Sequence, residues 1–172
     1  EYEYSLLAKE CGIEMPETLL FEGKYFGVER FDRSIRGKLH VVSIAGLLCA
    51  DYRIPGIDYL HILQICAELT HSIAELWKIY RLMVFNYLIG NKDDHAKNFS
   101  FIYRDEDWHF APAYDILPSN GMYGFHTTSI NDSITPTKED LIAVATKAGL
   151  PSKDAEAIFN QIHTILKSKH QV

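Results

Sequence analysis

One short stretch decides how this chain is interpreted: Asn91-Lys92-Asp93-Asp94-His95-Ala96-Lys97-Asn98. Within it, the acid Asp93 is followed five residues later by the amide Asn98, and a second acid, Asp115, comes 17 residues after that amide. Apolar segments lead into and out of these polar groups, and such framing is how a scaffold delivers reactive side chains to loops. The stretch therefore predicts two neighbouring loops that contribute to one polar site.

The types and spacing of these side chains are typical of phosphoryl transfer. One carboxylate orients the attacking hydroxyl, while an Asn and a second Asp hold Mg²⁺ against the phosphates. Protein kinases carry these groups as Asp-x4-Asn followed by a metal-binding Asp. No His-Arg precedes Asp93, and Asp115 is not followed by Phe-Gly, so the chain departs from ordinary eukaryotic kinases. By spacing alone, a solvated turn between a helix and a strand is an equal interpretation.

Composition places this 172-residue chain among globular proteins with one domain and a real core, because 47% of its residues are apolar and 23% are charged. No apolar run approaches the roughly 18 to 20 residues that span a bilayer, and no signal-peptide pattern is present, so we expect a cytoplasmic protein without membrane contact. The formal charge of −6 argues against direct nucleic-acid binding through a broad basic face. A start at Glu1, without an initiator Met, suggests part of a longer protein.

Three cysteines, Cys11, Cys49 and Cys66, show no Cys-x-x-Cys spacing. Each stands among apolar or helical residues. We therefore expect buried free thiols rather than a disulfide or a metal site.

Hydrophobic periodicity predicts a mainly helical α+β domain with two small hairpins. The expected helices cover residues 4–11, 44–50, 59–68, 72–90 and 135–148, and a last helix opens at residue 151. The expected hairpins pair residues 18–21 with 25–31, and residues 99–103 with 108–111. Gly90 and Gly149 are the expected helix stops.

Three segments together resemble the HipA family of bacterial serine/threonine kinases, the toxins of HipBA-type modules. They are Val28-Glu29-Arg30-Phe31-Asp32-Arg33, Asn91-x-Asp93-x-His95-x-x-Asn98 and Ala111-Pro112-Ala113-Tyr114-Asp115. The resemblance covers nearly all of residues 1–172 and concerns the C-terminal kinase-like part of that family. It implies the helical C-terminal lobe of the HipA fold.

The resemblance also implies roles for the residues of the central stretch. Asp93 matches the catalytic base that orients the substrate hydroxyl, and Asn98 and Asp115 match the Mg²⁺ ligands. His95 lies inside the loop and is expected to support it, although a metal site with Asp93 and Asp94 is a second interpretation of this His. Asp94 itself reads either as a solvated neighbour or as a loop brace.

A nucleotide site is implied by the first of the three segments. Glu29 and Phe31 match the hinge that reads the adenine edge of ATP through its backbone, and Asp32 matches a residue near the ribose. Read alone, residues 28–33 are an edge strand that runs into a polar turn. Glu1 aligns with the helix acid that pairs with the ATP-binding Lys of kinases.

The glycine-rich loop and phosphate-binding Lys of the family belong to its N-terminal lobe, and neither is identifiable here. The resemblance thus implies a missing or separate lobe, and we expect the isolated chain to bind nucleotide weakly and to have little kinase activity. Implied partners are a protein substrate of the translation machinery, with a Ser or Thr hydroxyl, and a HipB-like DNA-binding antitoxin.

Two other classes of function stay open at this point. The chain can be a non-catalytic binding module that keeps the lobe as an interaction surface. Alternatively, Asp93, Asp94, His95 and Asp115 can form the site of a metal-dependent hydrolase, which needs more ligands than the sequence places.

Overall fold

A computed structural model describes residues 1–35, 37–49, 56–121 and 124–169 of the chain. The helices are α1 (Tyr2–Glu10), α2 (Ile44–Leu47), α3 (Tyr59–Thr70), α4 (Ile73–Ile89), α5 (Lys138–Lys147) and α6 (Ser152–Ser168). The strands are β1 (Thr18–Phe21), β2 (Tyr25–Val28), β3 (Arg33–Ser34), β4 (Gly37–Lys38), β5 (His40–Ser43), β6 (Ile57–Asp58), β7 (Ser100–Arg104), β8 (Asp107–Phe110) and β9 (Thr128–Ser129). The predicted α+β class is confirmed.

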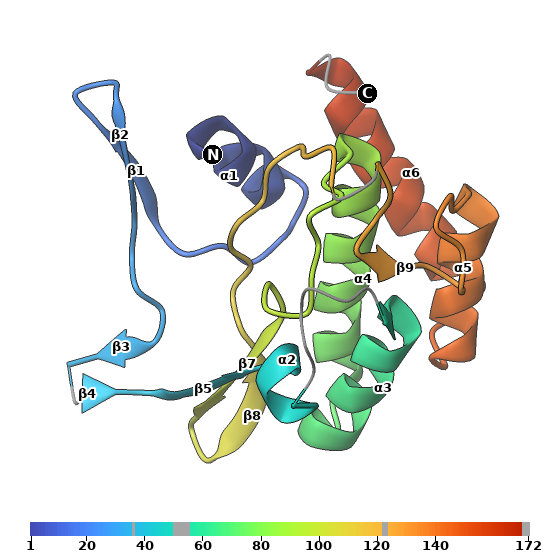
Figure 1. Ribbon diagram of the computed structural model, residues 1–172, viewed down its shortest axis with the longest axis horizontal. Coiled ribbons are helices and arrows are strands. Elements are labelled where there is room, and N and C mark those ends of the chain that lie inside the picture. The colour runs from blue at the N-terminus through green and yellow to red at the C-terminus, as the bar shows by residue number, and fades with distance from the viewer. Residues whose placement is uncertain (36, 50–55, 122–123, 170–172) are drawn as a thin grey trace.

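Helix α4 forms the centre of the molecule and packs against both α3 and α6 (Figure 1). Its side chains are apolar around most of its circumference, which is typical of a helix that is covered on several sides. Tyr80 and Phe85 are fully buried, and the Tyr80 hydroxyl donates a hydrogen bond to the carbonyl of Ala155 at the start of α6. In the described ranges, no helix is both long and apolar enough to cross a membrane.

A three-stranded antiparallel sheet, in the order β5-β7-β8, lies beside the helices. The sequence analysis predicted the β7–β8 hairpin. In the structure, Phe101 stands opposite Phe110 in this pair of strands. The pairing of β5 with β7, in which Val41 stands opposite Ile102, joins segments that are far apart in the sequence and was not predicted. The same holds for the short parallel pair of β6 and β9.

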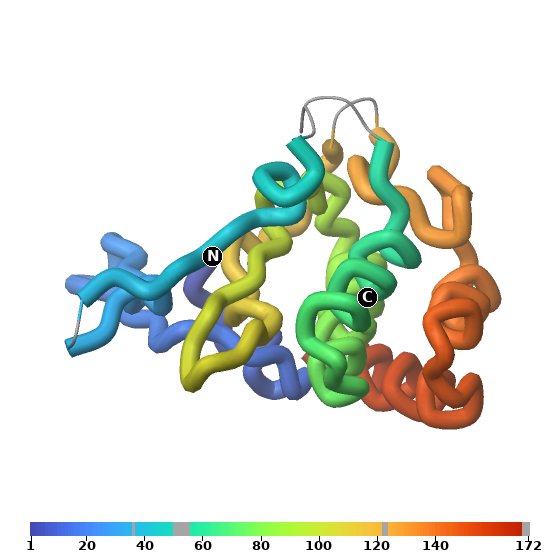
Figure 2. The backbone as a smooth tube through the Cα atoms, turned by 90° about the horizontal axis from the view of Figure 1, so that it is seen from below, coloured from blue at the N-terminus to red at the C-terminus, as the bar shows by residue number. Residues whose placement is uncertain are grey.

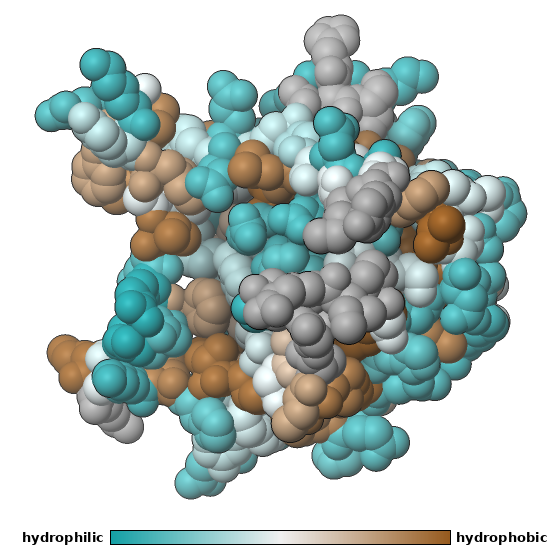
Figure 3. All heavy atoms as spheres, in the orientation of Figure 1, coloured by the Kyte–Doolittle hydropathy of each residue, from teal (hydrophilic) through white to brown (hydrophobic). Residues whose placement is uncertain are grey.

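The β1–β2 hairpin and the β3–β4 pair form an arm that extends away from the helices (Figure 2). Apolar side chains on this arm face solvent, including Tyr25 at 64% and Leu19 at 59% exposure, and tan and brown atoms mark the arm at the left of Figure 3. The predicted strand over residues 25–31 is too long. It ends at Val28, opposite Thr18 where its antiparallel partner begins, and one further bond follows, from the Glu29 N–H to the Glu17 carbonyl at 2.8 Å.

Three other expectations about local structure are corrected. The helix expected from residue 135 begins at Lys138, because Thr137 and Asp140 form a reciprocal capping box that fixes the later start. The helix expected over residues 44–50 ends at Leu47, and residue 50 lies outside the described ranges. Cys11 and Cys66 are buried as expected, but Cys49 is exposed in a turn with a positive φ of 49°.

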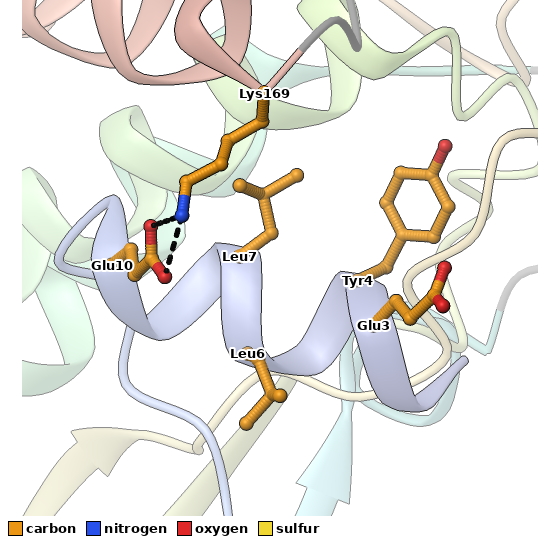
Figure 4. A pocket seen from close by; sticks show the side chains of 6 residues that line it. All are labelled: Glu3, Tyr4, Leu6, Leu7, Glu10 and Lys169. Atoms are coloured by element: carbon orange, nitrogen blue, oxygen red, sulfur yellow. Dashed lines mark hydrogen bonds and ion pairs between the residues drawn. The ribbon is translucent and has the colours of Figure 1, made fainter.

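Helix α1 and the end of α6 meet at one side of the body. The Lys169 ammonium contacts both carboxylate oxygens of Glu10, at 3.2 and 3.1 Å. Figure 4 shows this pair at the edge of a hollow of about 290 Å³ that is also lined by Glu3, Tyr4, Leu6 and Leu7. An exposed ion pair of this kind contributes little to stability.

Glu75 connects α4 to the sheet. Its buried carboxylate accepts hydrogen bonds from the Phe110 backbone N–H of β8 (2.9 Å) and from the Lys78 ammonium (2.9 Å). Burial alone would raise the pKa of Glu75, but these two partners outweigh burial, so the pKa lies below its ordinary value of 4.5. The ionised form is therefore the one that stabilises the fold.

We expect Glu75→Gln to lower the free energy of unfolding at pH 7 by about 1.5 to 3 kcal/mol, because the charged acceptor is lost. A group with a depressed pKa stabilises the native state above its unfolded pKa, and this contribution disappears as the pH falls through the folded value. Urea unfolding between pH 7 and pH 3 should therefore show the gap between the two proteins closing below about pH 4.5. Glu68→Gln, on the exposed side of α3, is the matched control. A gap that stays constant with pH would contradict this role for Glu75.

Candidate active site

The loop of residues 91–98 begins where α4 ends. Gly90 adopts the left-handed conformation, with φ 70°, and turns the chain out of the helix. Asn91 then forms a parallel bridge with Ser119, and the Asn98 N–H donates to the carbonyl of His95 at 2.8 Å. The Ala45 N–H of α2 donates to the Ala96 carbonyl at 3.1 Å, so both ends of the loop are held by other segments, and the chain leaves it through the buried Phe99 into β7.

Asp93 and Asn98 face the same part of this loop. Asp93 is exposed, and the Asn98 amide nitrogen donates to the Asp93 backbone carbonyl at 3.0 Å. This bond fixes the Asn98 side chain while leaving its amide oxygen as an acceptor. His95, half-buried between them, supplies the carbonyl that caps the turn.

Asp94, the next residue, is only 1% exposed and braces the loop from below. Its carboxylate accepts hydrogen bonds from the Tyr59 hydroxyl (3.0 Å) and from the backbone N–H groups of Thr127 (3.0 Å) and Thr128 (3.2 Å). His126 Nδ1 lies 3.0 Å from the same carboxylate. Of the two interpretations of Asp94, the loop brace is therefore the correct one.

The network around Asp94 continues into the helices. Asn86 of α4 donates to the Tyr59 oxygen at 3.1 Å, and Asn91 donates in turn to the Asn86 side chain at 3.1 Å. Burial and the Asp94 carboxylate raise the pKa of Tyr59 well above its ordinary value, so this hydroxyl keeps its proton and remains a donor. Local sequence patterns missed Tyr59, Asn86 and His126 as parts of the site.

Four groups inside the fold contact the Asp94 carboxylate. Asp94 is therefore not placed to bind a metal ion together with Asp93 and His95. In the part of the chain that the structure describes, no three His, Cys, Asp or Glu side chains are grouped to hold a metal ion. The hydrolase hypothesis relied on such a group.

Asp115 stands at the end of a buried segment that runs beside β7. The Ala111 N–H donates to Ser100, and the Ala113 N–H donates to Glu14, so the backbone before Asp115 is held on two sides. Asp115 itself is exposed and has a φ of 55°, a left-handed conformation that Asp tolerates better than most residues. The fold therefore presents this carboxylate from a fixed backbone.

Tyr114 brings the three predicted segments together. Its hydroxyl donates to the carbonyl of Lys97 (2.6 Å) and lies 2.6 Å from the Ser100 hydroxyl, while its ring stacks on Phe31 with centroids 5.7 Å apart. Burial raises the pKa of the Tyr114 hydroxyl, which therefore stays protonated. The sequence analysis quoted Tyr114 only as the neighbour of Asp115, and its one local signal is an aromatic residue directly before that acid.

A pocket of about 320 Å³ lies where these segments meet. It contains all three residues that the resemblance assigns to nucleotide, namely Glu29, Phe31 and Asp32, together with Tyr114 and Ser100. Its remaining lining consists of Pro16, Val28, Arg30 and Val41. A volume of this size suits a small-molecule ligand.

Asp32 is paired with two arginines at the edge of this pocket. Arg30 approaches it with two hydrogen bonds of 2.9 and 2.7 Å, and Arg33 with one of 2.6 Å. The Arg30 guanidinium holds the pKa of the Asp32 carboxyl below its ordinary value. Asp32 is thus an ionised acceptor, held in place at the rim.

Comparison with known proteins shows the family of this chain. A profile of the HipA-like C-terminal domain matches residues 1–169. The chain belongs to this family. The protein of Sinorhizobium fredii named "Putative kinase Y4dM" is 29% identical over 89% of this chain and 43% of its own length. The chain therefore spans less than half of this curated relative.

Two solved structures share the fold over the whole chain. HipA of Shewanella oneidensis, solved with HipB and operator DNA, matches with a TM-score of 0.79 at 20% identity, and the match covers 49% of that chain. The proinflammatory kinase CtkA of Helicobacter pylori matches with a TM-score of 0.59 at 14% identity over 82% of its chain. At these identities the likeness concerns the fold, and it confirms the predicted HipA-like C-terminal lobe.

Asp93 and Asp94 offer a matched test of this geometry. We expect Asp94→Ala to lower the free energy of unfolding by about 3 to 5 kcal/mol, because several buried donors lose their charged acceptor. Asp93→Ala should change it by no more than about 0.5 kcal/mol, because that side chain is exposed. Urea denaturation of both variants measures the difference. Equal losses would mean that Asp94 does not brace the loop.

Gly121 packs tightly against the same loop. It has a φ of +61°, and an added Cβ would lie 2.6 Å from the Phe125 carbonyl oxygen and 2.8 Å from the Lys92 Cβ. Gly124 has a φ of +82°, but a Cβ there meets nothing within 4 Å. The two glycines therefore separate backbone strain from steric overlap.

We expect Gly124→Ala to destabilise the fold by about 1 to 2 kcal/mol through the left-handed backbone alone. Gly121→Ala should cost about 1 to 3 kcal/mol more, because atoms beside the loop must move. Thermal unfolding followed by circular dichroism gives both values. Similar melting temperatures for the two variants would rule out close packing at Gly121.

Proposed function

We propose that this chain is the catalytic lobe of an ATP- and Mg²⁺-dependent serine/threonine protein kinase of HipA type. The observation that carries the proposal is the position of Tyr114, which contacts the Asp93–Asn98 loop, precedes Asp115 and stacks on Phe31 of the pocket. The metal and nucleotide groups implied by the family thus belong to one connected site. Membership of a family whose relatives are named as kinases supports the same function.

Three polar side chains of this site suit the chemistry of phosphoryl transfer. Asp93 would accept or orient the hydroxyl of a Ser or Thr side chain. The Asn98 amide oxygen and the Asp115 carboxylate are oxygen donors of the kind that Mg²⁺ prefers, and they would hold this ion when nucleotide is bound. Bound Mg²⁺ would supply charge neutralisation at the phosphates.

The pocket beneath Phe31 would hold the adenosine part of ATP. The Glu29 N–H donates to the Glu17 carbonyl at 2.8 Å, so the Glu29 carbonyl and the Phe31 backbone are the groups that would read a base edge. Asp32, ionised at the rim, would accept hydrogen bonds from ribose hydroxyls. His95 would keep a supporting role inside the loop.

Other parts of the proposal extend beyond this chain. The matched relative and the Shewanella HipA chain are about twice as long as the region covered here, and a further lobe would supply the phosphate-binding Lys. By analogy with the Shewanella complex, a HipB-like antitoxin would be the partner that contacts DNA, in a toxin–antitoxin module of the cytoplasm. The protein substrate would offer a Ser or Thr hydroxyl. Without the second lobe we expect weak nucleotide binding and little kinase activity, because charge clamps on the phosphates typically contribute several orders of magnitude in rate.

Calorimetric titration with ATP tests the site directly. We expect weak binding, with a Kd of about 0.1 to 1 mM, that requires Mg²⁺ and disappears in Asp115→Asn. This substitution keeps a residue that tolerates the left-handed backbone, so the fold should be preserved. Asp105→Asn is the matched control, because Asp105 is an exposed Asp with a φ of 52° in the β7–β8 turn.

Binding that is independent of Mg²⁺, or equally reduced in both variants, would contradict a metal site at Asp115. Absence of ATP binding under all conditions would favour the alternative in which the lobe is a non-catalytic binding module.

A further inference from the structure

A further hollow, of about 510 Å³, includes Lys92 of the 91–98 loop in its lining. Its lining comes from the end of α4, Lys92, residues 124–126, residues 134–136 and His163 of α6. Figure 1 shows the chain around β9 between α4 and α5. No residue of the nucleotide pocket lines it, so the two cavities are separate.

Three aromatic side chains of the lining, Tyr87, His126 and His163, belong to a row of rings that Phe159 completes from outside the lining. His126 stacks on Tyr87 with centroids 6.5 Å apart, Tyr87 lies 6.4 Å from Phe159, and Phe159 stacks on His163 at 6.2 Å. His126 is only 8% exposed, and its Nδ1 faces the Asp94 carboxylate. Because Nδ1 is engaged by this carboxylate, Nε2 is the ring nitrogen left for a ligand.

Lys92 contributes a permanent positive charge to the hollow. Its carbonyl accepts hydrogen bonds from the Thr127 N–H and hydroxyl, both at 3.1 Å, so its backbone is fixed. Among the described residues that line the hollow, none carries a carboxylate, although the whole chain has a formal charge of −6. The apolar part of the lining includes Phe125 and Ile134, which are 41% and 53% exposed.

We propose that this hollow is an acidic-segment subsite, which binds a carboxylate-bearing stretch of the protein substrate. The inference rests on the proposed kinase function. Lys92 directly precedes Asp93, and their Cα atoms are about 3.8 Å apart. A substrate chain whose Ser or Thr reached Asp93 would therefore pass the hollow within a few residues of that hydroxyl.

The lining favours a peptide over other anionic partners. One Lys beside exposed apolar side chains suits a Glu or Asp with an apolar neighbour, and a volume of this size can enclose such side chains. Nucleic acid needs several cations spaced along a backbone, and the lining supplies one Lys and two His. Charge complementarity thus selects an acidic, partly apolar protein segment.

The test uses two short labelled peptides of equal length, each with one central Ser. One carries Glu and Leu on both sides of the Ser, and the other has Gln in place of every Glu. Fluorescence anisotropy at low ionic strength should show the Glu peptide binding this chain about fivefold more tightly, the size expected of one partly exposed ion pair. Lys92→Met should remove this preference.

Two further variants keep the test specific. Lys153→Met removes the same charge from an exposed position of α6 outside the hollow and should leave the preference intact. His163→Leu alters the opposite wall, away from the loop, and should weaken binding of the Glu peptide two- to threefold. Circular dichroism of each variant confirms that it is folded.

Equal binding of the two peptides, binding of neither, or an equal effect of Lys92→Met and Lys153→Met would overturn the subsite. Calorimetry with ATP and Mg²⁺ on the same samples separates the two proposals. Nucleotide binding without peptide discrimination overturns the subsite alone. Peptide discrimination without nucleotide binding overturns the kinase function and retains the hollow as a site for acidic segments.

Discussion

The buried carboxylate of Asp94 is the interaction on which the rest of the site depends. It draws the Tyr59 hydroxyl from α3 and two backbone N–H groups from residues 127 and 128 to one point below the loop. An ionised carboxylate at 1% exposure is stable only when several donors satisfy it. The same requirement that keeps Asp94 paired therefore fixes the loop relative to the helices.

Tyr114 connects the loop to the pocket that contains Phe31. Its hydroxyl bonds to Lys97 at the end of the loop, and its ring contacts Phe31 in the segment after β2. A residue that is neither acidic nor a metal ligand thus joins the exposed acids to the pocket. Because both contacts are made by one rigid side chain, a displacement of residues 29–32 would be transmitted to the backbone that carries Asp115.

Local patterns in the sequence predicted the loop, the β7–β8 hairpin and the central helix, because spacing and periodicity specify each of them within one short stretch of chain. They did not predict that β5 pairs with β7 or that Asp94 meets residues 126–128, since these contacts join segments that are distant in the sequence. The start of α5 was missed for a local reason: Thr135-Pro136 and Thr137-x-x-Asp140 are competing start signals, and the reciprocal capping box prevailed. The roles of Asp93, Asn98 and Asp115 remain predictions that rest on the family resemblance.

Asp93 and Asp94 are neighbours in this loop, but Asp94 is buried and Asp93 is exposed. This difference bears on whether the lobe is catalytic. A non-catalytic module would still need Asp94, because the fold loses its brace without it. It would have no structural need for the exposed side chains of Asp93 and Asp115, and an exposed Asp in a left-handed conformation at residue 115 is less favourable than Gly. Both acids nevertheless match the catalytic base and a Mg²⁺ ligand in the family resemblance. Stability therefore accounts for Asp94, whereas the proposed kinase chemistry would account for the two exposed acids.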